Sequence, residues 1–266
     1  MSRGRRALFG AAVATLWLAS CAPPPTPGDL TTFAARYRIE RARRAGHLAA
    51  AEADMVLRIE GRAIGRLPGL IVSTGLAAPD RARLRGTWML GTAFDLLAER
   101  DSVRVWLPTE HAVLELGGLA DSLRRPRPLA ILFTALAASW DPPESAWRGA
   151  IAESSDVRMG WREGGDSLSL EVDGASRPSQ LRIEREGRVV WVRYSGWRNV
   201  GGIEWPVRIE IADANGWFRL RTELQSLRAV QRLNESWFEL RVPADAERLD
   251  WPSVRARLSA RREDRP

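Results

Sequence analysis

The chain contains no lysine, two histidines and a single cysteine. Without lysine it lacks a Schiff-base nucleophile, a Ser-x-x-Lys pair and a P-loop lysine. One cysteine excludes an internal disulfide and a cysteine-rich metal site. His47 and His111 stand in no zinc-binding spacing, and no Gly-x-Ser-x-Gly elbow occurs. We therefore expect a protein that is not an enzyme, with no metal and no soluble cofactor.

The positive charge of the chain is carried entirely by arginine, with 40 basic residues against 33 acidic ones. Acids and bases alternate in segments such as RIEREGR, residues 182–188. This alternation is typical of a solvated strand face, whereas nucleic-acid binding needs a basic stripe with aromatic platforms. We expect no nucleic-acid partner, although the arginines are compatible with a weak attraction to anionic lipid headgroups. The 12 tryptophans suit a large core, a ligand cavity or a membrane interface.

The N-terminus has the pattern of an export signal. Three arginines within the first six residues precede an uncharged apolar run, residues 7–19, which is too short for a permanent membrane span. The run ends in Leu18-Ala19-Ser20-Cys21, which resembles the bacterial lipobox. The resemblance implies cleavage between Ser20 and Cys21, followed by attachment of diacylglycerol and an N-acyl chain to Cys21, whose thiolate is the nucleophile. The alternative is an ordinary secretory signal with a cysteine there by chance.

The position after the cysteine bears on localisation, because in the best-known sorting system an aspartate there retains lipoproteins at the inner membrane. Ala22 stands there instead, so we expect a protein anchored by its lipid to the outer membrane and facing the periplasm. We divide the chain into a signal peptide (1–20), the lipidated cysteine with a proline-rich tether (21–29), one folded domain (30–250) and a charged tail (251–266).

The folded domain is predicted to be mainly β. Helical spacing predicts a helix over residues 30–51 and a strongly apolar helix over 127–140, which must be buried or lie over an apolar opening. A period of two predicts strands elsewhere: 53–64, 70–76, 81–90, 94–99, 102–108, 111–116, 157–163, 166–173, 180–186, 188–197, 204–212, 217–227 and 236–243. Because the turns are short and no βαβ rhythm appears, we expect an α+β fold with one strongly curved antiparallel sheet, an incomplete barrel, whose concave face is covered by helices.

Several segments together resemble the LolA/LolB-like superfamily of periplasmic lipoprotein carriers and outer-membrane lipoprotein receptors. They are the opening helix, the strands ending in FDLLAERDSVRVWLPTEHAVLELGG, the apolar helix, LRIEREGRVVWVRYSGWRNVGGIEWPVRIEI and ESWFELRVPADAERLD. In the last segment, Phe238, Leu240 and Pro243 resemble the closing strand. The lipobox favours the LolB-like receptors, since the soluble carrier lacks one. The resemblance implies a half-barrel lidded by helices, with an apolar cavity for acyl chains. It also implies a monomer that takes lipid or lipoprotein cargo from a periplasmic carrier protein.

An acyl-chain site needs only apolar side chains, because each buried methylene group contributes ~0.8 kcal/mol. We expect the inward residues of the strands and the apolar helix to line it: Leu57, Ile59, Leu84, Trp88, Leu96, Val105, Leu132, Leu136, Trp191 and Ile209. By resemblance to the receptor, the hairpin at residues 63–71 supplies an exposed hydrophobic loop with Leu67 and Leu70. The alternative function is a non-catalytic envelope assembly or sensor lipoprotein, which has the same fold filled by its own side chains and acts through a protein-protein surface.

Overall fold

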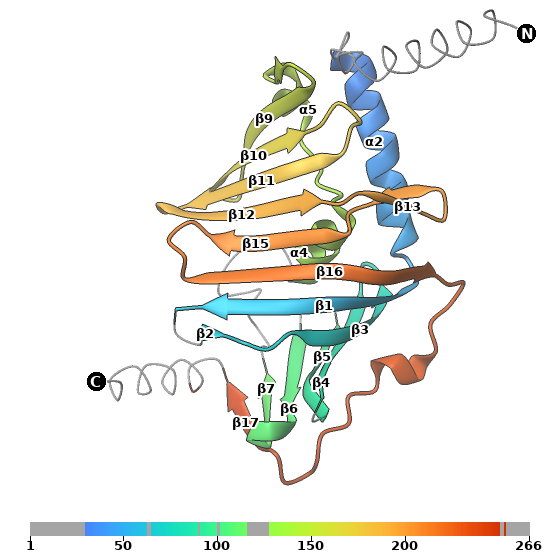
Figure 1. Cartoon of the computed structure of the whole chain (residues 1–266), viewed down its shortest axis with the longest axis vertical. Helices are drawn as coiled ribbons and strands as arrows, with labels where there is room; N and C mark the ends of the chain where they lie inside the picture. The colour runs from blue at the N-terminus through green and yellow to red at the C-terminus, as the bar shows by residue number, and fades with distance from the viewer. Residues whose placement is uncertain are drawn as a thin grey trace, which may run out of the picture.

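The computed structural model describes residues 30–62, 65–89, 91–99, 102–115, 128–250 and 253. The predicted signal peptide, the cleavage and lipidation site at Ser20 and Cys21, the tether, and the predicted tail apart from Ser253 lie outside the described residues. Most of the described chain is strand, with few helices (Figure 1).

The secondary structure begins with α2 (Leu30–His47), and the other described α-helices are α4 (Pro128–Ala137) and α5 (Glu144–Arg148). The first half of the chain supplies seven strands: β1 (Ala51–Gly61), β2 (Gly65–Arg66), β3 (Leu70–Ala77), β4 (Arg81–Trp88), β5 (Gly91–Glu99), β6 (Ser102–Leu107) and β7 (Ala112–Glu115). The second half supplies ten: β8 (Ile151–Glu153), β9 (Asp156–Glu163), β10 (Asp166–Val172), β11 (Pro178–Arg185), β12 (Arg188–Ser195), β13 (Arg198–Val200), β14 (Ile203–Trp205), β15 (Arg208–Asp213), β16 (Phe218–Ala229) and β17 (Glu247–Asp250). Short 3-10 helices cover Pro108–Glu110 and Glu235–Phe238.

One large sheet runs through the molecule in the order β17-β7-β6-β5-β4-β3-β1-β16-β15-β12-β11-β10-β9-β8, with β2 paired to β1. Neighbouring strands are antiparallel except for the parallel pair of β17 and β7 at one edge. Strands β1 to β7 form one wing with β17 at its edge, strands β8 to β12, β15 and β16 form the other, and β1 joins the two by pairing with β16 along its whole length. The predicted curved antiparallel sheet is confirmed, with one parallel edge strand added.

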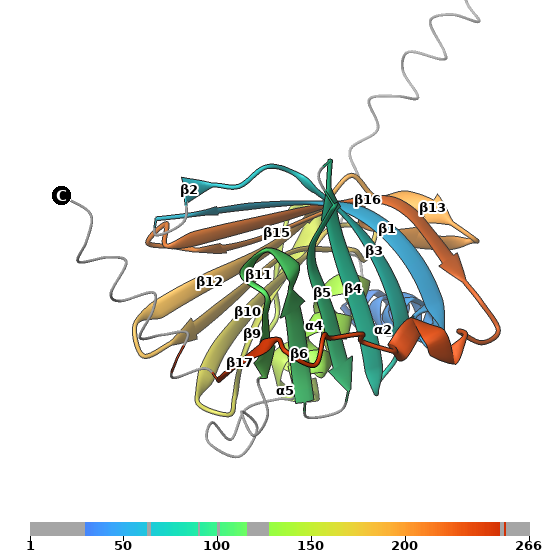
Figure 2. The same cartoon turned by 90° about the horizontal axis from the view of Figure 1, so that it is seen from below.

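The inner, concave face of the sheet carries the core. Along β1, buried Ala51, Ala53, Met55 and Leu57 alternate with more exposed residues, as expected for a strand with one face covered. A register shift between Asp54 and Met55 marks a bulge, which bends a strand and increases its twist. Seen from below, α2, α4 and α5 lie within the curve of the sheet (Figure 2). The predicted placement of helices on the concave face is therefore confirmed.

The inner layer has two ends of different chemistry. At one end, which we call the aromatic half, α2 and α5 pack on β9 to β12 through Phe33, Tyr37, Trp140, Trp147 and Tyr194. At the other end, the aliphatic half, a small buried cluster lies on β1 and β3, flanked by partly buried apolar side chains of β1, β4, β5 and β16. Its buried members are Met55, Leu57, Leu70 and Val72, and the flanking ones include Ile59, Leu84, Phe94 and Leu220.

The predicted strand over residues 236–243 is wrong. Residues 230–246, which we call the strap, cross the outer face of β3 to β5 and contain a 3-10 helix, and only the following residues form β17 (Figure 1). Asn234 starts the 3-10 helix by accepting a hydrogen bond from the Ser236 amide. Alternating apolar residues produced the strand prediction, but here Phe238 packs on the back of the sheet with Leu97 and Leu233.

The remaining element predictions agree with the structure to within a few residues. The first helix ends at His47 rather than at residue 51, and the apolar helix spans Pro128–Ala137. The short helix α5 and the β13–β14 hairpin, which forms its own two-stranded sheet, were not predicted as separate elements.

Candidate functional site

The inner face of the aliphatic half is built from rows of directly paired residues. One row begins in this half and runs across five strands, from Leu70 through Leu57, Thr222 and Ile209 to Tyr194 of the aromatic half. Directly opposite residues of neighbouring strands share a face of the sheet. The row therefore places predicted residues from β1, β3 and β15 on one continuous surface.

Two further rows extend this surface. Ile59 pairs with Leu220, and Leu220 pairs with Ile211, nearer the end of β1. On the other wing, Leu84 pairs with Leu96 and Leu96 with Val105. All six side chains of these two further rows are only partly buried, so the aliphatic half presents more accessible apolar surface than a sealed core does.

Leu136 of α4 joins the clusters of the inner layer. It packs against the aromatic half, the aliphatic half and the central cluster between them, which includes Phe133 and Trp205. The predicted apolar helix therefore lies over the middle of the concave face. Leu132 belongs to the same helix, but its side chain lies outside the described part of the structure.

The space beneath α4 is nearly filled. A cavity of about 20 Å³ remains between Leu48, Met55, Leu136, Trp205 and Leu224, among other apolar residues. This volume corresponds to about one water-sized sphere. An acyl chain bound at this position requires side chains or α4 to move, whereas the partly buried rows of the aliphatic half are accessible already.

Two of the predicted cavity residues lie elsewhere. Trp191 is on the outer face, because it alternates with the inward Val192 and Tyr194. Its ring lies between the guanidinium groups of Arg182 and Arg193, each 5.7 Å from the ring centroid. The prediction that Trp191 points inward is therefore wrong, since cation-π contacts hold the ring at the charged surface.

Trp88 is the second predicted cavity residue that lies elsewhere, and only one of the two predicted loop residues is exposed. Trp88 ends β4 and is 38% exposed at the turn to β5. Leu67 is 37% exposed, as the loop prediction requires, but Leu70 is buried in β3 against Leu57 and belongs to the inner surface. Residues 63 and 64 of the predicted loop lie outside the described residues.

Sequence reasoning missed Phe94, Val72 and Leu220 as members of this surface. The phenyl ring of Phe94 lies on Gly86 of the neighbouring strand, where an added Cβ would be only 2.3 Å from a ring carbon. Glycine at position 86 is thus required for the ring to lie flat. The signal was present, because a period of two places Phe94 on the same face as Leu96.

The aromatic half is sealed by polar contacts inside the core. The Tyr37 hydroxyl donates to the Trp140 carbonyl, and the Trp140 indole donates to the Tyr194 hydroxyl, both at 2.7 Å. Burial raises the pKa of Tyr37 and of Tyr194 well above their ordinary values. These bonds connect α2, the segment after α4 and β12 into one unit.

Arg44 is a fully buried guanidinium at the boundary of this half. It donates from Nη2 to the Ala138 carbonyl at 3.3 Å and lies 5.4 Å from the ring centroid of Trp197. Burial lowers its pKa, partly offset by Tyr37 and Glu40. The contact with Ala138 ties α2 to the residue that follows α4.

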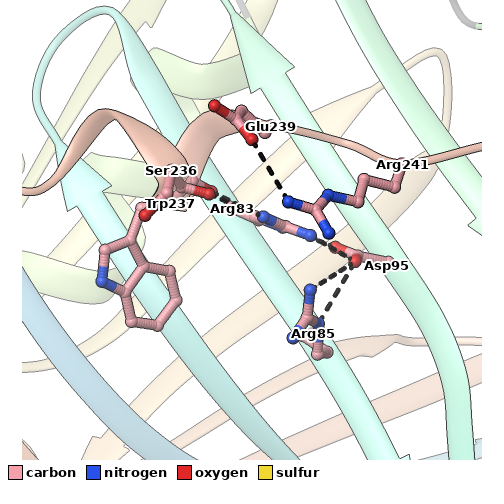
Figure 3. Close-up of polar contacts among 7 residues, drawn as sticks. All are labelled: Arg83, Arg85, Asp95, Ser236, Trp237, Glu239 and Arg241. Carbon is pink, nitrogen blue, oxygen red and sulfur yellow. Dashed lines mark hydrogen bonds and ion pairs between the residues drawn. The ribbon is translucent and has the colours of Figure 1, made fainter.

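The aliphatic half is stabilised from its outer face by the strap (Figure 3). Arg83 donates from Nε and Nη2 to the Asp95 carboxylate at 2.8 and 2.6 Å, and from Nη1 to the Trp237 carbonyl at 3.0 Å. The hydrogen bond to Asp95 raises the pKa of Arg83. The Trp237 ring lies on Gly75, where an added Cβ would be 2.8 Å from it. Here the polar contacts lie behind the sheet, so the inner face stays free of them.

The outer face of β1, β16, β15 and β12 is charged. A groove of about 530 Å³ crosses it, and guanidinium and carboxylate groups oppose each other along it, as in the pair of Arg221 and Glu210 at 2.6 Å. Such a surface suits polar contacts rather than an acyl chain. Among the described residues, no group of three or more metal-ligating side chains is close enough together to hold a metal ion. No helix in the described part of the chain has the length and apolarity needed to cross a membrane.

Comparison with known proteins identifies the fold. No family model and no curated protein matches the sequence. A solved domain from Vibrio parahaemolyticus, described as an outer membrane lipoprotein-sorting protein, is 12% identical over 76% of this chain and 94% of that one, with a TM-score of 0.51. A LolA superfamily protein from Nitrosomonas europaea is 12% identical over 75% of this chain and 97% of that one, with a TM-score of 0.48. The chain thus has the fold of the lipoprotein-sorting proteins, as its sequence pattern predicts.

Proposed function

We propose that this protein binds acyl chains, as free lipid or as the lipid part of a lipoprotein, on the inner face of the aliphatic half. The observation that carries the proposal is the set of paired apolar rows, including Ile59–Leu220 and Leu84–Leu96–Val105, that stay partly exposed inside a curved sheet. Apolar surface of this kind gains free energy when an acyl chain covers it.

We further propose that Cys21 carries the lipid anchor and that the domain works at the periplasmic side of the outer membrane. The lipobox and Ala22 support this location. The lipoprotein-sorting fold supports a role in receiving or passing on acylated cargo. This role requires binding and release of the cargo, and it needs no catalytic residue.

The test is a titration of a fluorescent fatty-acyl probe, together with native mass spectrometry of the purified protein to detect bound lipid. Leu220→Gln puts an amide on the inner face and should weaken probe binding about 5- to 150-fold, since burying an unpaired amide costs about 1–3 kcal/mol. Ile39→Gln is the matched control, because Ile39 is 59% exposed on α2. A folded protein that binds neither lipid nor probe would overturn the proposal.

A second function is favoured by the filled space under α4. The residual cavity of about 20 Å³ fits a non-catalytic assembly or sensor lipoprotein that acts through a protein surface. In that case the titration would show no saturable probe binding. Pull-downs from the envelope would recover the same partner protein with the wild-type chain and with Leu220→Gln.

A further inference from the structure

Exposed apolar side chains gather where the end of β1 meets β2 and the start of β16. Trp217 and Phe218 follow the β15–β16 turn and are 45% and 41% exposed, and Leu67 follows β2. The two segments are neighbours, because the Arg62 amide donates to the Trp217 carbonyl and the Leu67 amide donates to the Ile59 carbonyl. Large apolar side chains that gather on an exposed surface mark a site of interaction with a protein or a membrane.

Arginines surround these residues. The Arg62 guanidinium lies 5.6 Å from the ring centroid of Trp217. Arg62, Arg66 and Arg219 also line a groove of about 460 Å³ beside Phe218, together with Glu60 and Asp213. We call Arg62, Arg66, Leu67, Trp217, Phe218 and Arg219 the rim.

The two acids do not balance the three guanidinium groups. Glu60 lies 3.5 Å from Arg66 and 3.9 Å from Arg219, while one oxygen of Asp213 accepts the backbone amides of Asn215 and Trp217 and shapes the turn. Arg219 also lies 3.8 Å from Glu210, but that carboxylate is shared with Arg193 and Arg221 outside the rim. The rim therefore combines apolar rings with an excess of positive charge. Tryptophan prefers the headgroup level of a bilayer, and arginine is attracted to anionic headgroups.

We propose that the rim docks on the surface of an anionic lipid bilayer, with Trp217, Phe218 and Leu67 at headgroup depth and the three arginines against lipid phosphates. The inference rests on the proposed function, because the Ile59–Leu220 row of the aliphatic half lies directly next to the rim. Docking here places the apolar inner surface next to the bilayer, so that an acyl chain passes between them along a short path.

The experiment uses the full chain with Cys21→Ser, which removes the only cysteine, and Asn215→Cys, which places one environment-sensitive fluorophore on the β15–β16 turn. The protein is reconstituted into vesicles of phosphatidylcholine, with or without phosphatidylglycerol. We expect a blue-shifted emission and quenching by headgroup-labelled lipid only in the anionic vesicles. Ile151→Cys is the matched control, because Ile151 is 59% exposed on β8. This strand is at an edge of the sheet, whereas the rim lies on β1, β2 and β16 in the middle of the strand order, so the label at 151 should stay in water.

Charge and ring variants then test the contact itself. Arg66→Gln and Arg219→Gln should each lower the docked fraction relative to the free one about fivefold, because a basic residue near an anionic surface contributes ~1 kcal/mol. Arg241→Gln, whose side chain is 91% exposed on the strap, should change nothing. Trp217→Ser should abolish the blue shift.

Three outcomes would overturn the proposal: equal signals from the labels at 215 and 151, equal signals in neutral and anionic vesicles, or release of the rim by inorganic phosphate at matched ionic strength, which would assign the groove to free phosphate. A parallel acyl-probe titration separates the two claims. If probe binding persists while the rim stays in water, the docking inference fails and the proposed function stands. If the rim docks and no probe binds, the docking inference stands and the proposed function fails.

Discussion

The aromatic half and the aliphatic half share one sheet, but they are stabilised from opposite sides. In the aromatic half the hydrogen bonds lie inside, where Tyr37, Trp140 and Tyr194 connect helix, loop and strand. In the aliphatic half they lie outside, where the strap meets Arg83 and Asp95. Polar bonds on the outer face allow the inner face to remain mainly apolar and partly open. The comparison indicates which end is scaffold and which end is free to bind.

The largest effect is expected in the scaffold. Trp140→Ala should lower the free energy of unfolding by about 3–5 kcal/mol, because it removes a large buried ring as well as the indole donor to Tyr194. Trp217→Ala, at an exposed tryptophan, should cost about 0.5 kcal/mol or less. Urea unfolding followed by circular dichroism gives both values. Loss of acyl-probe binding in a Trp140→Ala protein that is still folded would move the binding site to the aromatic half.

A somewhat smaller effect is expected at the strap. Arg83→Met should cost about 3 kcal/mol, because it leaves the buried Asp95 carboxylate with only the half-exposed Arg85 as ion-pair partner. Arg241→Met is the control, since that side chain lies in water. Limited proteolysis should then cleave the chain within residues 230–246 first. If Arg83→Met proved as stable as Arg241→Met, the strap would not be what stabilises the aliphatic half.

Alkaline pH isolates the aromatic half. The chain has no lysine and only two tyrosines, so with Cys21→Ser the two buried hydroxyls dominate the side-chain titration near their ordinary pKa of about 10. Because burial raises the pKa of Tyr37 and of Tyr194, the folded state keeps its protons longer than the unfolded state does. Stability is therefore full below pH ~10 and falls as the pH rises above it.

The measurement is the urea midpoint as a function of pH, together with tyrosinate absorbance. The folded protein should show no tyrosinate until it unfolds, and the double variant Tyr37→Phe, Tyr194→Phe should lose the decline. Tyrosinate that forms at ordinary pH in a folded sample would show that the two hydroxyls are accessible and that the aromatic half is open.

The sequence predicted the sheet because alternation is a local property that each strand displays. It also located Leu57, Leu84, Leu96 and Ile209 on the inner face, since period two decides the face once one member is known. It placed Trp191 on the wrong face. A tryptophan between two valines looks the same in the sequence whether its ring packs in the core or between two arginines on the surface.

The strap shows the second limit of sequence reasoning. WFELRVP alternates like a strand, but nothing in its pattern shows that the carbonyls of Ser236 and Trp237 accept hydrogen bonds from the side chain of Arg83 in the distant β4. The rim shows a third limit. Trp217, Arg62 and Leu67 are ordinary turn residues along the chain, and only the pairing of β1 with β16 brings them together.

A modest change in stability is expected on the partly buried row where Leu220→Gln should have the largest effect on binding. Leu220→Ala, on the partly buried row beside Ile59, should cost about 1 kcal/mol, because much of that side chain is already accessible to water. The truncation keeps the surface apolar, so acyl-probe binding should survive with a modest change, whereas Leu220→Gln should lose it at similar stability. Paired urea unfolding and probe titrations on the three proteins separate packing from binding. A loss of several kcal/mol on Leu220→Ala would mean that this end of the sheet is a closed core, and the contrast between the two halves would then fail.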